Sequence, residues 1–434
     1  MGKEVRPPRG FRDFEPELML LRKKLFSLLE DVFQRYGFDP IDTPALEYWE
    51  TLAGKYGEEA EARLIWRFRD PWSGREYALR YDLTVPLARF IATHRDVSLP
   101  FKRYHIAPVW RHEEPQRGRY REFYQCDADI VGSKYPEADA EIVNLLASAL
   151  DSLGLKGMYR IRLNDRRLLY GIFEEELGIR DPLPVYRAID KLDKIGMDGV
   201  VGELYKIGLG ESMIERIAKI IELKGDPSQV LGGLLKRYGG NNNVREAARH
   251  LDELFELLEN PGVVELDMSL VRGLDYYTGP IMEAVFEKEK VGSIAGGGRY
   301  DNLIGMFIGS EIPATGVSIG IERIIDAGIA TGIYSLEKKT STEVQVIVLD
   351  RESFKYAWKV ANRLRGEGIK ARIDLNRTNH RVQLRKARKL GIPIVVFIGR
   401  KERDEGKVTV YHVEQGTREE YRLEEAAPRI KERL

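Results

Sequence analysis

The sequence has a single cysteine, Cys126, and no long hydrophobic run. One cysteine excludes an internal disulfide and any zinc site built from several thiolates. The longest clean apolar stretch, Ile392 to Ile398, has the length of a strand and falls far short of the roughly 18 residues that span a bilayer. The first residues, MGKEVRPPRGF, lack the apolar core of a secretion signal. These absences predict a cytoplasmic protein without a membrane span.

The chain also lacks net charge, because 69 Lys and Arg residues balance 69 Asp and Glu residues. The balance conceals an asymmetry: residues 343–434 hold 22 basic against 14 acidic side chains, a surplus of eight that the first 342 residues offset. A basic C-terminal module on an acidic body attracts phosphates. A solvated charged surface explains the same numbers, so charge alone does not establish a nucleic-acid partner.

Neither the P-loop fingerprint nor the Rossmann glycine fingerprint occurs anywhere in the sequence. If the protein uses ATP, it therefore binds the nucleotide through another architecture.

A chain of 434 residues with 43% hydrophobic and 32% charged residues is too long for one ordinary core. Residues 64–132 and 263–320 contain short alternating segments typical of antiparallel strands. Between them, residues 165–262 show helical periodicity. We therefore predict an α+β domain over residues 1–330, an antiparallel sheet flanked by helices, with a helical insertion at residues 165–262.

Two further segments complete the predicted organisation. Apolar residues recur every three or four positions from Leu18 to Tyr36, which predicts an amphipathic helix that Gly37 ends. A segment rich in Lys, Thr and Ser, Glu337 to Glu343, reads as a hinge. After it, strands and helices alternate over residues 343–434, which predicts a small C-terminal α/β domain.

Two short glycine-containing stretches carry the strongest functional signal. LVRGLDYYTG, Leu270 to Gly279, sets Arg272, Tyr276 and Tyr277 beside residues that disfavour helix. AGGGRYD, Ala295 to Asp301, places three glycines where a backbone can approach a flat or phosphorylated ligand. A strained loop and a glycine-rich turn would explain either stretch alone, but their close succession predicts a site that binds a small polar ligand and stabilises negative charge.

The segment from Phe101 to Gly132 is the second concentration of polar groups. Arginines bracket a loop between two strand-like pieces, and the guanidinium fork suits a triphosphate: Arg111, Arg119 and Arg121. On the strand that follows, Gln125, Asp127 and Asp129 alternate, so their side chains would share one face. Such a face is costly to bury without a cationic or donor-rich ligand, and an exposed sheet face is the alternative.

The two histidines of the same segment have no third ligand at a plausible spacing. We interpret His105 and His112 as structural or ligand-positioning residues, and we predict no structural metal. Asp82, in LRYDLT, is by itself equally compatible with a turn carboxylate that accepts backbone hydrogen bonds.

Together these motifs resemble the histidyl-tRNA synthetase family of class II aminoacyl-tRNA synthetases, over essentially the whole length. The first helix and the strand ending at Pro44 resemble motif 1, the dimer-forming element of the class. FKRYHIAPVWRHEEPQRGRYREF resembles motif 2 and GVSIGIERI resembles motif 3. LVRGLDYYTG and AGGGRYD resemble the two peptides that mark the histidine-specific family. The RYDLT form is closer to archaeal and eukaryotic members, because bacterial members usually carry glutamate at the position of Asp82.

The resemblance implies a role for each matching residue. Histidine would be held by six residues: Asp82, Thr84, Gln125, Asp129, Tyr276 and Tyr277. ATP, accompanied by Mg²⁺, would contact four: Arg111, Glu113, Arg119 and Arg323. Arg272, together with Arg111, would stabilise charge on the α-phosphate as the histidine carboxylate attacks.

For histidine tRNA, the resemblance implies an anticodon-binding role for the C-terminal domain. Asn379 and Arg381 are candidates for anticodon contacts, although a capped, charged helix start explains them nearly as well. Gln116 and Arg117 are candidates for reading the 5′ end of the tRNA, because Glu114 stands where bacterial members often have a basic residue. The implied assembly is a homodimer formed through motif 1.

Two other functions stay open at this point. A regulatory paralogue of the same fold serves as a non-catalytic, histidine-sensing subunit of the first enzyme of histidine biosynthesis, and a nucleic-acid-binding module could keep the fold without its chemistry. Such paralogues typically lack the anticodon domain and parts of the arginine set. Arg111, Arg272, Arg323 and the terminal module are all present here, which favours the ligase.

Overall fold

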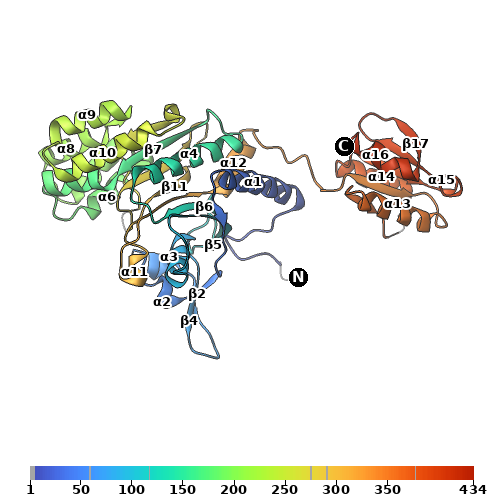
Figure 1. Cartoon of the computed structure of the whole chain (residues 1–434), viewed down its shortest axis with the longest axis horizontal. Helices are drawn as coiled ribbons and strands as arrows, with labels where there is room; N and C mark the ends of the chain where they lie inside the picture. Colours follow the sequence, from blue (N-terminus) through green and yellow to red (C-terminus); the bar gives the residue numbers. More distant parts are fainter. Residues whose placement is uncertain (1–4, 58–59, 117, 274–275, 290–291, 377) are drawn as a thin grey trace. The chain divides into compact units, whose positions relative to one another are not determined.

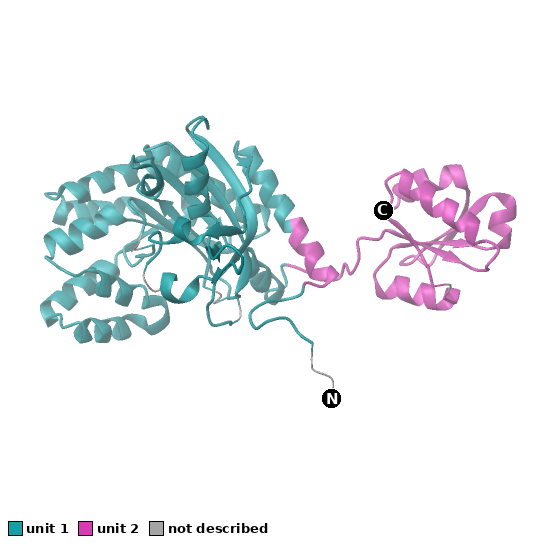
Figure 2. Cartoon of the chain, turned by 90° about the horizontal axis from the view of Figure 1, so that it is seen from below, with its two compact units in different colours: residues 1–13, 25–333 teal, residues 14–24, 334–434 magenta. Residues whose placement is uncertain are grey.

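The computed structural model describes residues 5–57, 60–116, 118–273, 276–289, 292–376 and 378–434 (Figure 1). These residues form two compact units (Figure 2). The first contains residues 5–13 and 25–333, and the second contains residues 14–24 and 334–434. Within the described ranges, no helix is long and apolar enough to cross a membrane.

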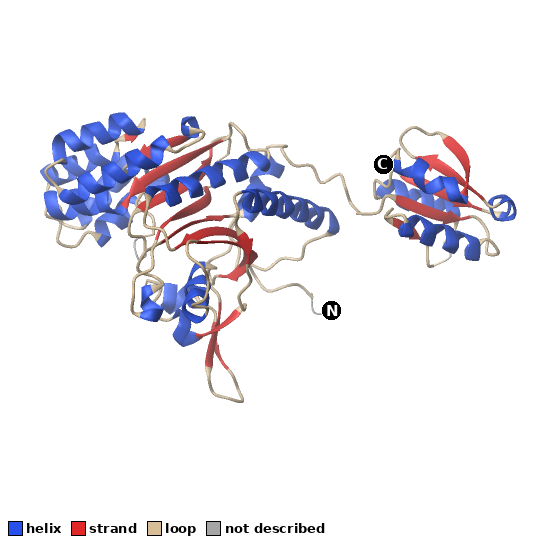
Figure 3. Cartoon of the chain, in the orientation of Figure 1, coloured by secondary structure: helices blue, strands red, loops and turns tan. Residues whose placement is uncertain are grey.

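A nine-stranded sheet, counted over the described residues, is the framework of the first unit (Figure 3). Its strands lie in the order β1 (Asp39–Pro40), β5 (Phe101–Trp110), β6 (Glu122–Val131), β12 (Ala314–Ile319), β11 (Ser293–Arg299), β10 (Pro280–Phe286), β7 (Tyr159–Asp165), β9 (Val264–Asp267) and β8 (Lys224–Gly225). Neighbours run antiparallel except for β1 with β5 and β7 with β9. The predicted antiparallel sheet with flanking helices is therefore present.

The two faces of this sheet differ in chemistry because successive side chains of a strand point to opposite sides. On β6, Cys126, Ala128 and Ile130 are buried apolar residues, and α4 (Pro136–Ser152) and α12 (Ile321–Ala330) are among the helices that contact this strand. The opposite face carries polar side chains and, at the end of β6, packs Val131 in one cluster with Leu87 of α3 (Thr84–Thr93). Function is therefore expected on the face beside α3.

Two helices, α4 and α1, begin where the sequence provides a start signal. Pro136 stands in the first turn of α4, where its missing N–H costs nothing, and two acidic residues follow it in that turn. α1 (Pro16–Arg35) also begins at a proline, and it ends just before Gly37, which adopts φ of 76°. The helix predicted over residues 18–36 is thus confirmed with its ends shifted by one or two residues.

The segment between β7 and β9 is mainly helical and forms the group of helices that carries the labels α6, α8, α9 and α10 in Figure 1. It consists of α5 (Arg166–Leu169), η2 (Tyr170–Glu176), α6 (Leu183–Ile189), α7 (Leu192–Lys206), α8 (Glu211–Ile221), α9 (Pro227–Tyr238) and α10 (Asn242–Glu256). Only the short strand β8 interrupts it, and β8 pairs with β9 at the edge of the sheet. Helical periodicity identified the segment, but a two-residue strand leaves no periodic signal.

A buried charged cluster joins this helical segment to the sheet. Asp139 of α4 accepts hydrogen bonds from Arg299 of β11, at 2.7 Å from Nη2 and 3.1 Å from Nε, and lies 2.8 Å from Nε2 of His250 in α10. All three side chains are buried. The Arg299 guanidinium also donates to the backbone carbonyls of Ser133 and Tyr135. One carboxylate therefore ties together α4, α10 and the glycine-rich strand.

Smaller elements complete the first unit. A three-stranded sheet, in the order β2-β4-β3, contains β2 (Leu46–Tyr48), β4 (Glu76–Leu79) and β3 (Arg67–Arg69). The short helical segments are α2 (Trp49–Leu52), η1 (Ala60–Leu64), η3 (Pro261–Val263) and α11 (Gly305–Ile308).

The second unit contains a five-stranded mixed sheet among its described residues, in the order β14 (Ala371–Ile373), β13 (Val344–Val348), β15 (Ile394–Ile398), β16 (Lys407–His412) and β17 (Arg418–Arg422). The helices of its C-terminal part are α13 (Phe354–Gly366), α14 (His380–Lys389), α15 (Arg400–Glu405) and α16 (Leu423–Lys431). The α/β domain was predicted. Its last strand β17 and helices α15 and α16 were not, because they are short and highly charged.

The buried cluster at Asp139 leads to a first prediction. Replacing Asp139 by alanine breaks the buried ion pair and leaves Arg299 with only the longer contact of Nη1 to Asp301, at 3.3 Å. Breaking a buried pair typically costs about 3–5 kcal/mol of unfolding free energy. Urea unfolding followed by circular dichroism measures the loss. Glu253→Ala, which removes an exposed ion pair to Arg249 on α10, is the control and should change stability by less than about 0.5 kcal/mol. A loss below about 1 kcal/mol for Asp139→Ala would show that the cluster does not stabilise the fold.

Candidate functional site

The floor of the candidate site is a polar row on β6. Gln125, Asp127 and Asp129 are all buried and share the face beside α3, as their alternation predicts. The amide nitrogen of Gln125 donates to Ser318 Oγ at 2.7 Å. Asp127 Oδ1 and Gln125 Oε1 are buried without a hydrogen-bond partner. Orphaned buried acceptors are costly, so these two oxygens indicate a place where a donor-rich ligand fits.

Asp129 is held more completely than its neighbours. Its Oδ2 lies 2.7 Å from Nη2 of Arg103, which stands directly opposite on β5, and its Oδ1 accepts from the hydroxyl of Tyr300. Gly316 of β12 makes room for this carboxylate, because a Cβ there would lie 2.0 Å from Asp129 Oδ1. The glycine of β12 is thus required by a side chain of the neighbouring strand.

The carboxylates of the polar row on β6 have raised pKa values, which a bound cation would lower again. Burial raises the pKa of Asp127 to about 7; the Arg103 charge opposes this shift, and the Asp129 charge adds to it. Burial also raises the pKa of Asp129 against the opposing effect of Arg103. A cationic ligand beside Asp127 would restore its ionised form, since an opposite charge at short range stabilises the carboxylate.

Asp82 lies at the start of α3 and works as a cap. Its Oδ1 accepts from the backbone N–H groups of Thr84 at 3.2 Å and Val85 at 3.0 Å, and from the Tyr56 hydroxyl at 3.0 Å. The turn-carboxylate interpretation is therefore correct for one oxygen of this group. Burial raises the pKa of Asp82, while the Val85 N–H and the Arg111 charge oppose the shift.

Two adjacent tyrosines form a wall next to this floor. The rings of Tyr276 and Tyr277 lie 4.4 Å apart, and the Tyr276 hydroxyl donates to that of Tyr277 at 3.2 Å. The ring of Tyr277 packs over Gly298, where a Cβ would lie 3.0 Å from it. Tyr56, Tyr276 and Tyr277 also line a cavity of about 810 Å³. A glycine strand beneath an aromatic wall suits a flat polar ligand.

A cluster of arginines lies beside the polar row. Arg111 donates from Nε to the Tyr81 carbonyl at 3.1 Å, and its guanidinium lies over the Tyr81 ring. Arg323 donates from Nη1 to the Ser293 carbonyl at 2.6 Å and from Nε to Gly118 at 3.2 Å. Burial lowers the pKa of Arg323, and the charges of Arg119, Arg272 and Arg111 lower it further. This mutual repulsion would be relieved by a polyanion.

Two carboxylates accompany these arginines. Glu113 Oε2 lies 3.3 Å from Nε of Arg119. Arg272 Nη2 lies 2.6 Å from Glu283 Oε1, and Glu283 is buried on β10. Arg272 lies above the same cross-sheet row as Asp127, because Gly296, beneath it, is the β11 partner of Ser318, and Ser318 is the β12 partner of Asp127. Its charge also acts on Arg323. Buried carboxylates with an orphaned acceptor and a group of mutually repelling arginines therefore lie on one part of the sheet.

The family follows from comparison with known proteins. The model of the family described as histidyl-tRNA synthetase matches residues 10–324, and the model described as anticodon binding domain matches residues 343–433. The histidine–tRNA ligase of Aeropyrum pernix is 63% identical over 433 residues, covering 100% of this chain and 99% of that protein. The chain belongs to the histidyl-tRNA synthetase family.

Two further relatives agree with this membership. The histidine–tRNA ligase of Korarchaeum cryptofilum is 52% identical over 93% of this chain and 94% of its own length. The crystal structure of histidyl-tRNA synthetase from Nostoc sp. PCC 7120 covers 100% of both chains at 30% identity, with a TM-score of 0.86. The class II fold expected from the sequence motifs is thereby confirmed, and the archaeal resemblance with it.

The remaining candidate residues of this synthetase-family chain lie outside the row and the arginine cluster. Gln116 pairs with Arg119 through backbone hydrogen bonds in a tight turn, and Arg117 lies outside the described residues. Asn379 caps α14, accepting from the Arg381 N–H at 2.8 Å, and both side chains are exposed. The cap accounts for Asn379 structurally and leaves Arg381 free of that role.

Both histidines of the Phe101–Gly132 segment contact other side chains of the fold. His105 Nε2 lies 2.9 Å from Asp42, and burial, aided by the charges of Arg103 and Arg80, lowers its pKa to about 4. His112 packs edge-on against Trp66. Within the part of the chain that the structure describes, no three His, Cys, Asp or Glu residues gather where they could hold a metal.

Sequence reasoning missed several residues of the site. Asp127 was noticed in the alternation but not assigned, although it carries an orphaned oxygen. Arg103 and Tyr300, which hold Asp129, come from β5 and from the loop after β11. Tyr56 and Glu283 were also missed. Tyr300 lay inside the AGGGRYD signal, whereas the other partners become neighbours of the site only when the sheet is assembled.

The arginine cluster predicts polyanion binding that can be measured without a reaction. Tripolyphosphate at about 100 times its dissociation constant should stabilise the protein by about 2.7 kcal/mol and raise its melting temperature. Arg323→Ala should remove most of this increase, whereas Lys219→Ala, on an exposed position of α8, should leave it unchanged. Each variant is compared with its own ligand-free melting curve. Equal increases in all three proteins would show that the arginines do not form the anion site.

Proposed function

We propose that this protein is a histidine–tRNA ligase, which activates L-histidine with ATP and transfers the histidyl group to the 3′ end of histidine tRNA. One observation carries the proposal in addition to family membership: the Arg272 guanidinium lies over Gly296, in strand register with a buried polar row that suits an amino acid, and its charge adds to a cluster of arginines that suits a triphosphate.

The amino-acid half of the site follows from the chemistry of its groups. Asp127 and Gln125 offer unpartnered acceptors to the α-ammonium group. Asp129, fixed by Arg103 and Tyr300, keeps further lone pairs for an imidazole N–H, since a carboxylate accepts about four hydrogen bonds. Tyr276 and Tyr277 would enclose the ring. A site that hydrogen-bonds its substrate in this way rejects analogues that lack the matching groups.

Asp82 and Thr84 would complete the amino-acid pocket from the start of α3. The second oxygen of Asp82 is the one available to a ligand, because the first is used by the helix cap and by Tyr56. A carboxylate anchored in this way is pre-organised, so little conformational entropy is lost when the substrate binds.

The nucleotide half would be built by Arg111, Glu113, Arg119 and Arg323. Arg111 is fixed over Tyr81 and would contact the α-phosphate, while Arg119 and Arg323 would take the outer phosphates. Mg²⁺ would arrive with ATP and screen the phosphate charge. Among the described residues, no three His, Cys, Asp or Glu side chains gather where they could hold the ion by themselves.

The reaction would proceed in two steps without a covalent enzyme intermediate. A carboxylate oxygen of histidine attacks the α-phosphorus in line, and the bond to the β-phosphate bridging oxygen breaks, which releases pyrophosphate. The 3′-hydroxyl of the tRNA then attacks the acyl carbon, forming an ester as AMP leaves. Arg272 and Arg111 would stabilise the charge on the α-phosphate in both steps. Positioning and pre-organised charge supply the rate.

The tRNA would contact other parts of the chain. The basic C-terminal module, residues 343–434, would bind the anticodon, with Arg381 as a candidate and Asn379 holding the helix start. Gln116 and Arg117 would approach the 5′ end. The catalytic domain would occupy residues 1–330, and the helical insertion, residues 165–262, would meet the acceptor stem. A homodimer through motif 1 and a cytoplasmic location belong to the same proposal.

The regulatory alternative is not favoured. Its members typically lose the anticodon domain and part of the arginine set, whereas here Arg111, Arg272 and Arg323 all lie at the site and the terminal module matches the anticodon-binding family.

Amino-acid-dependent ATP–pyrophosphate exchange, run without tRNA on all twenty amino acids, tests the proposal. We expect exchange with histidine alone. Arg272→Ala should lower the exchange rate several hundredfold, equivalent to about 3–4 kcal/mol, while histidine binding persists. Arg272→Lys keeps the charge but loses the fork, so it should recover only part of the rate. Histidine binding without any exchange by the unaltered protein would favour the regulatory function instead.

Histidine binding should also depend on pH through Asp127. In the free protein its pKa is about 7, so the group is largely protonated at pH 6; an ammonium ion beside it favours the ionised form. Binding should therefore release ~1 more proton at pH 6 than in Asp127→Asn, and affinity should rise with pH up to about 7. Titration calorimetry in buffers of different ionisation enthalpy measures the release. The imidazole contributes equally to both proteins, so equal release would place the ammonium away from Asp127.

A further inference from the structure

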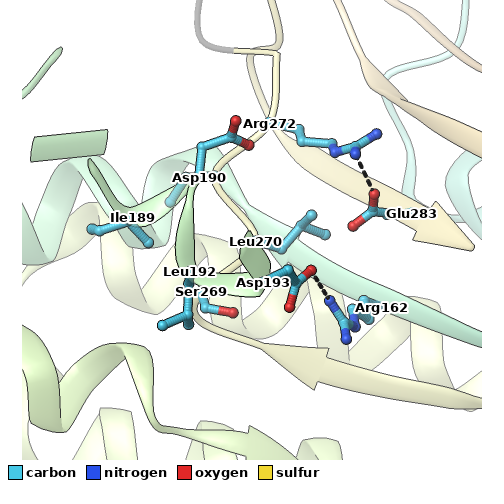
Figure 4. Close-up of a pocket in the computed structure, with 10 residues that line it drawn as sticks. Arg162, Ile189, Asp190, Leu192, Asp193, Ser269, Leu270, Arg272 and Glu283 are labelled. Carbon is cyan, nitrogen blue, oxygen red and sulfur yellow. Dashed lines mark hydrogen bonds and ion pairs between the residues drawn. The ribbon is translucent and has the colours of Figure 1, made fainter. Parts of the chain in front are cut away.

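A small pocket of about 40 Å³ lies where the helical insertion meets the sheet (Figure 4). The insertion contributes Asp190, at the end of α6, and Asp193, in the first turn of α7. The sheet contributes Arg162 of β7 and Glu283 of β10, and Arg272 closes the pocket. The reacting arginine of the proposed site is therefore a direct neighbour of the insertion.

The strand register places the charged residues of this pocket in one row with the amino-acid floor. Arg162 stands opposite Glu283, Glu283 opposite Gly296, and Gly296 opposite Ser318, which is the partner of Asp127. Directly opposite residues of neighbouring strands point to the same face. One row across the sheet thus runs from Asp127, through Glu283, to Arg162 under the insertion.

Glu283 holds one end of the Arg272 guanidinium. The two side chains meet at 2.6 Å between Nη2 and Oε1; the Glu283 side chain is 5% exposed and that of Arg272 is 43% exposed. Nη1 of Arg272 lies over Gly296, 3.7 Å from the position of a Cβ there. A fork fixed at one nitrogen presents the other toward the space above the glycine strand, which is where the reacting phosphate would lie.

Arg162 is shared among carboxylates of two structural parts. Its Nη1 lies 2.9 Å from Asp193 of the insertion, whereas its Nε lies 3.6 Å from Asp267 and 3.7 Å from Glu265 on β9. Figure 4 marks the Arg162–Asp193 and Arg272–Glu283 pairs with dashed lines, and all four residues line the same pocket. Asp193 belongs to the insertion and Arg162 to the sheet, so their contact depends on where the insertion lies. The Asp193 side chain is 68% exposed.

We propose that Glu283 is a positioning residue for Arg272, and that the Arg162–Asp193 ion pair couples the position of the helical insertion to Arg272 through Glu283. The inference rests on the proposed ligase function. While Asp193 pairs with Arg162 and neutralises its charge, Glu283 pairs with Arg272 alone. When the insertion withdraws Asp193, the Arg162 charge competes with Arg272 for Glu283, and the fork loses its fixed end.

The electrostatics of Glu283 support this coupling. Burial raises its pKa, the charges of Arg272 and Arg162 oppose the shift, and the charge of Asp193 adds to it. Arg272, Arg162 and Asp193 therefore all act on the protonation state of one buried carboxylate. A ligand that moves the insertion, such as the acceptor stem of a tRNA, would change the reacting centre without contacting Arg272.

The test is a double-mutant cycle on histidine-dependent pyrophosphate exchange. Glu283→Ala should lower kcat about 100-fold, because a misplaced reacting group costs about this much, and should leave the histidine dissociation constant within about twofold. Glu283→Gln keeps an acceptor for Arg272 and should lose about tenfold. Asp193→Asn should lose about fivefold to tenfold, a usual size for coupling between sites.

The decisive comparison is Asp193→Asn in two backgrounds. If the coupling passes through Glu283, Asp193→Asn has little effect once Glu283→Gln is present. Glu203→Gln, which removes ion pairs to Lys191 and Lys206 on the same helices, is the matched control and should leave exchange unchanged. Circular dichroism and histidine binding confirm that each variant is folded, and the exposed Asp193 provides a change that the core tolerates.

Each outcome decides the inference. The proposal is supported if Asp193→Asn lowers the exchange rate by the expected factor alone but has little effect in the presence of Glu283→Gln. An Asp193→Asn effect of equal size in both backgrounds overturns the coupling, as does the absence of any effect. A Glu283→Ala variant that loses histidine affinity and rate together overturns the positioning role. Absence of exchange from the unaltered protein overturns the ligase proposal itself, which is a separate and distinguishable result.

Discussion

Arg103 and Asp129 meet at 2.7 Å on neighbouring strands, where both side chains are almost completely removed from solvent. Two buried charges are costly unless they are paired and hydrogen-bonded. Here the pair is supported by the Tyr300 hydroxyl and by the Leu83 carbonyl, which accepts from Arg103. The pair also sets the state of Asp127, because Arg103 favours its ionised form and Asp129 opposes it. The polar floor of the site therefore depends on this contact.

Two groups of opposite charge lie side by side on the same face of the sheet. Carboxylates and an amide lie on β6, while arginines gather beside them, each fixed by carbonyls, aromatic rings or a carboxylate. Neither group is fully balanced within the protein: acceptors are orphaned on one side, and like charges repel on the other. An ammonium group would supply donors to the orphaned acceptors, and a polyphosphate would reduce the repulsion among the arginines. The charged groups of the site are therefore already in place before the substrates bind.

Glycines in the strands make this arrangement possible. Gly316 leaves space for the Asp129 carboxylate, Gly298 for the Tyr277 ring, and Gly296 lies beneath the Arg272 guanidinium. Side chains at these positions would fill the space that the ligand and its contacts require. The glycine strand is in turn anchored by Arg299, whose partner Asp139 also binds the insertion through His250. Packing of the insertion and shape of the site are therefore physically connected.

Local patterns predicted the class of fold, the helical segment and the C-terminal α/β module, because periodicity depends only on residues close in sequence. They failed at β8, β17 and α15, where a few residues take their structure from neighbouring strands or from a cap. Among the site residues, Gln125 and Asp129 were found because alternation on one strand fixes a shared face.

By itself, the sequence determined which residues could carry the chemistry: the arginines, the β6 carboxylates, the paired tyrosines and the glycine runs. Only the tertiary structure decided their partners. Asp129 pairs with Arg103, Arg272 with Glu283, and Arg162 with Asp193, and the partners are separated by 11 to 31 positions along the chain. For Arg103 and Asp129 the reason is register, because hydrogen-bonded pairing of β5 with β6 sets them opposite each other. Arg272, in the loop before β10, and Asp193, in α7, meet their partners only where the insertion packs on the sheet, which no local pattern encodes.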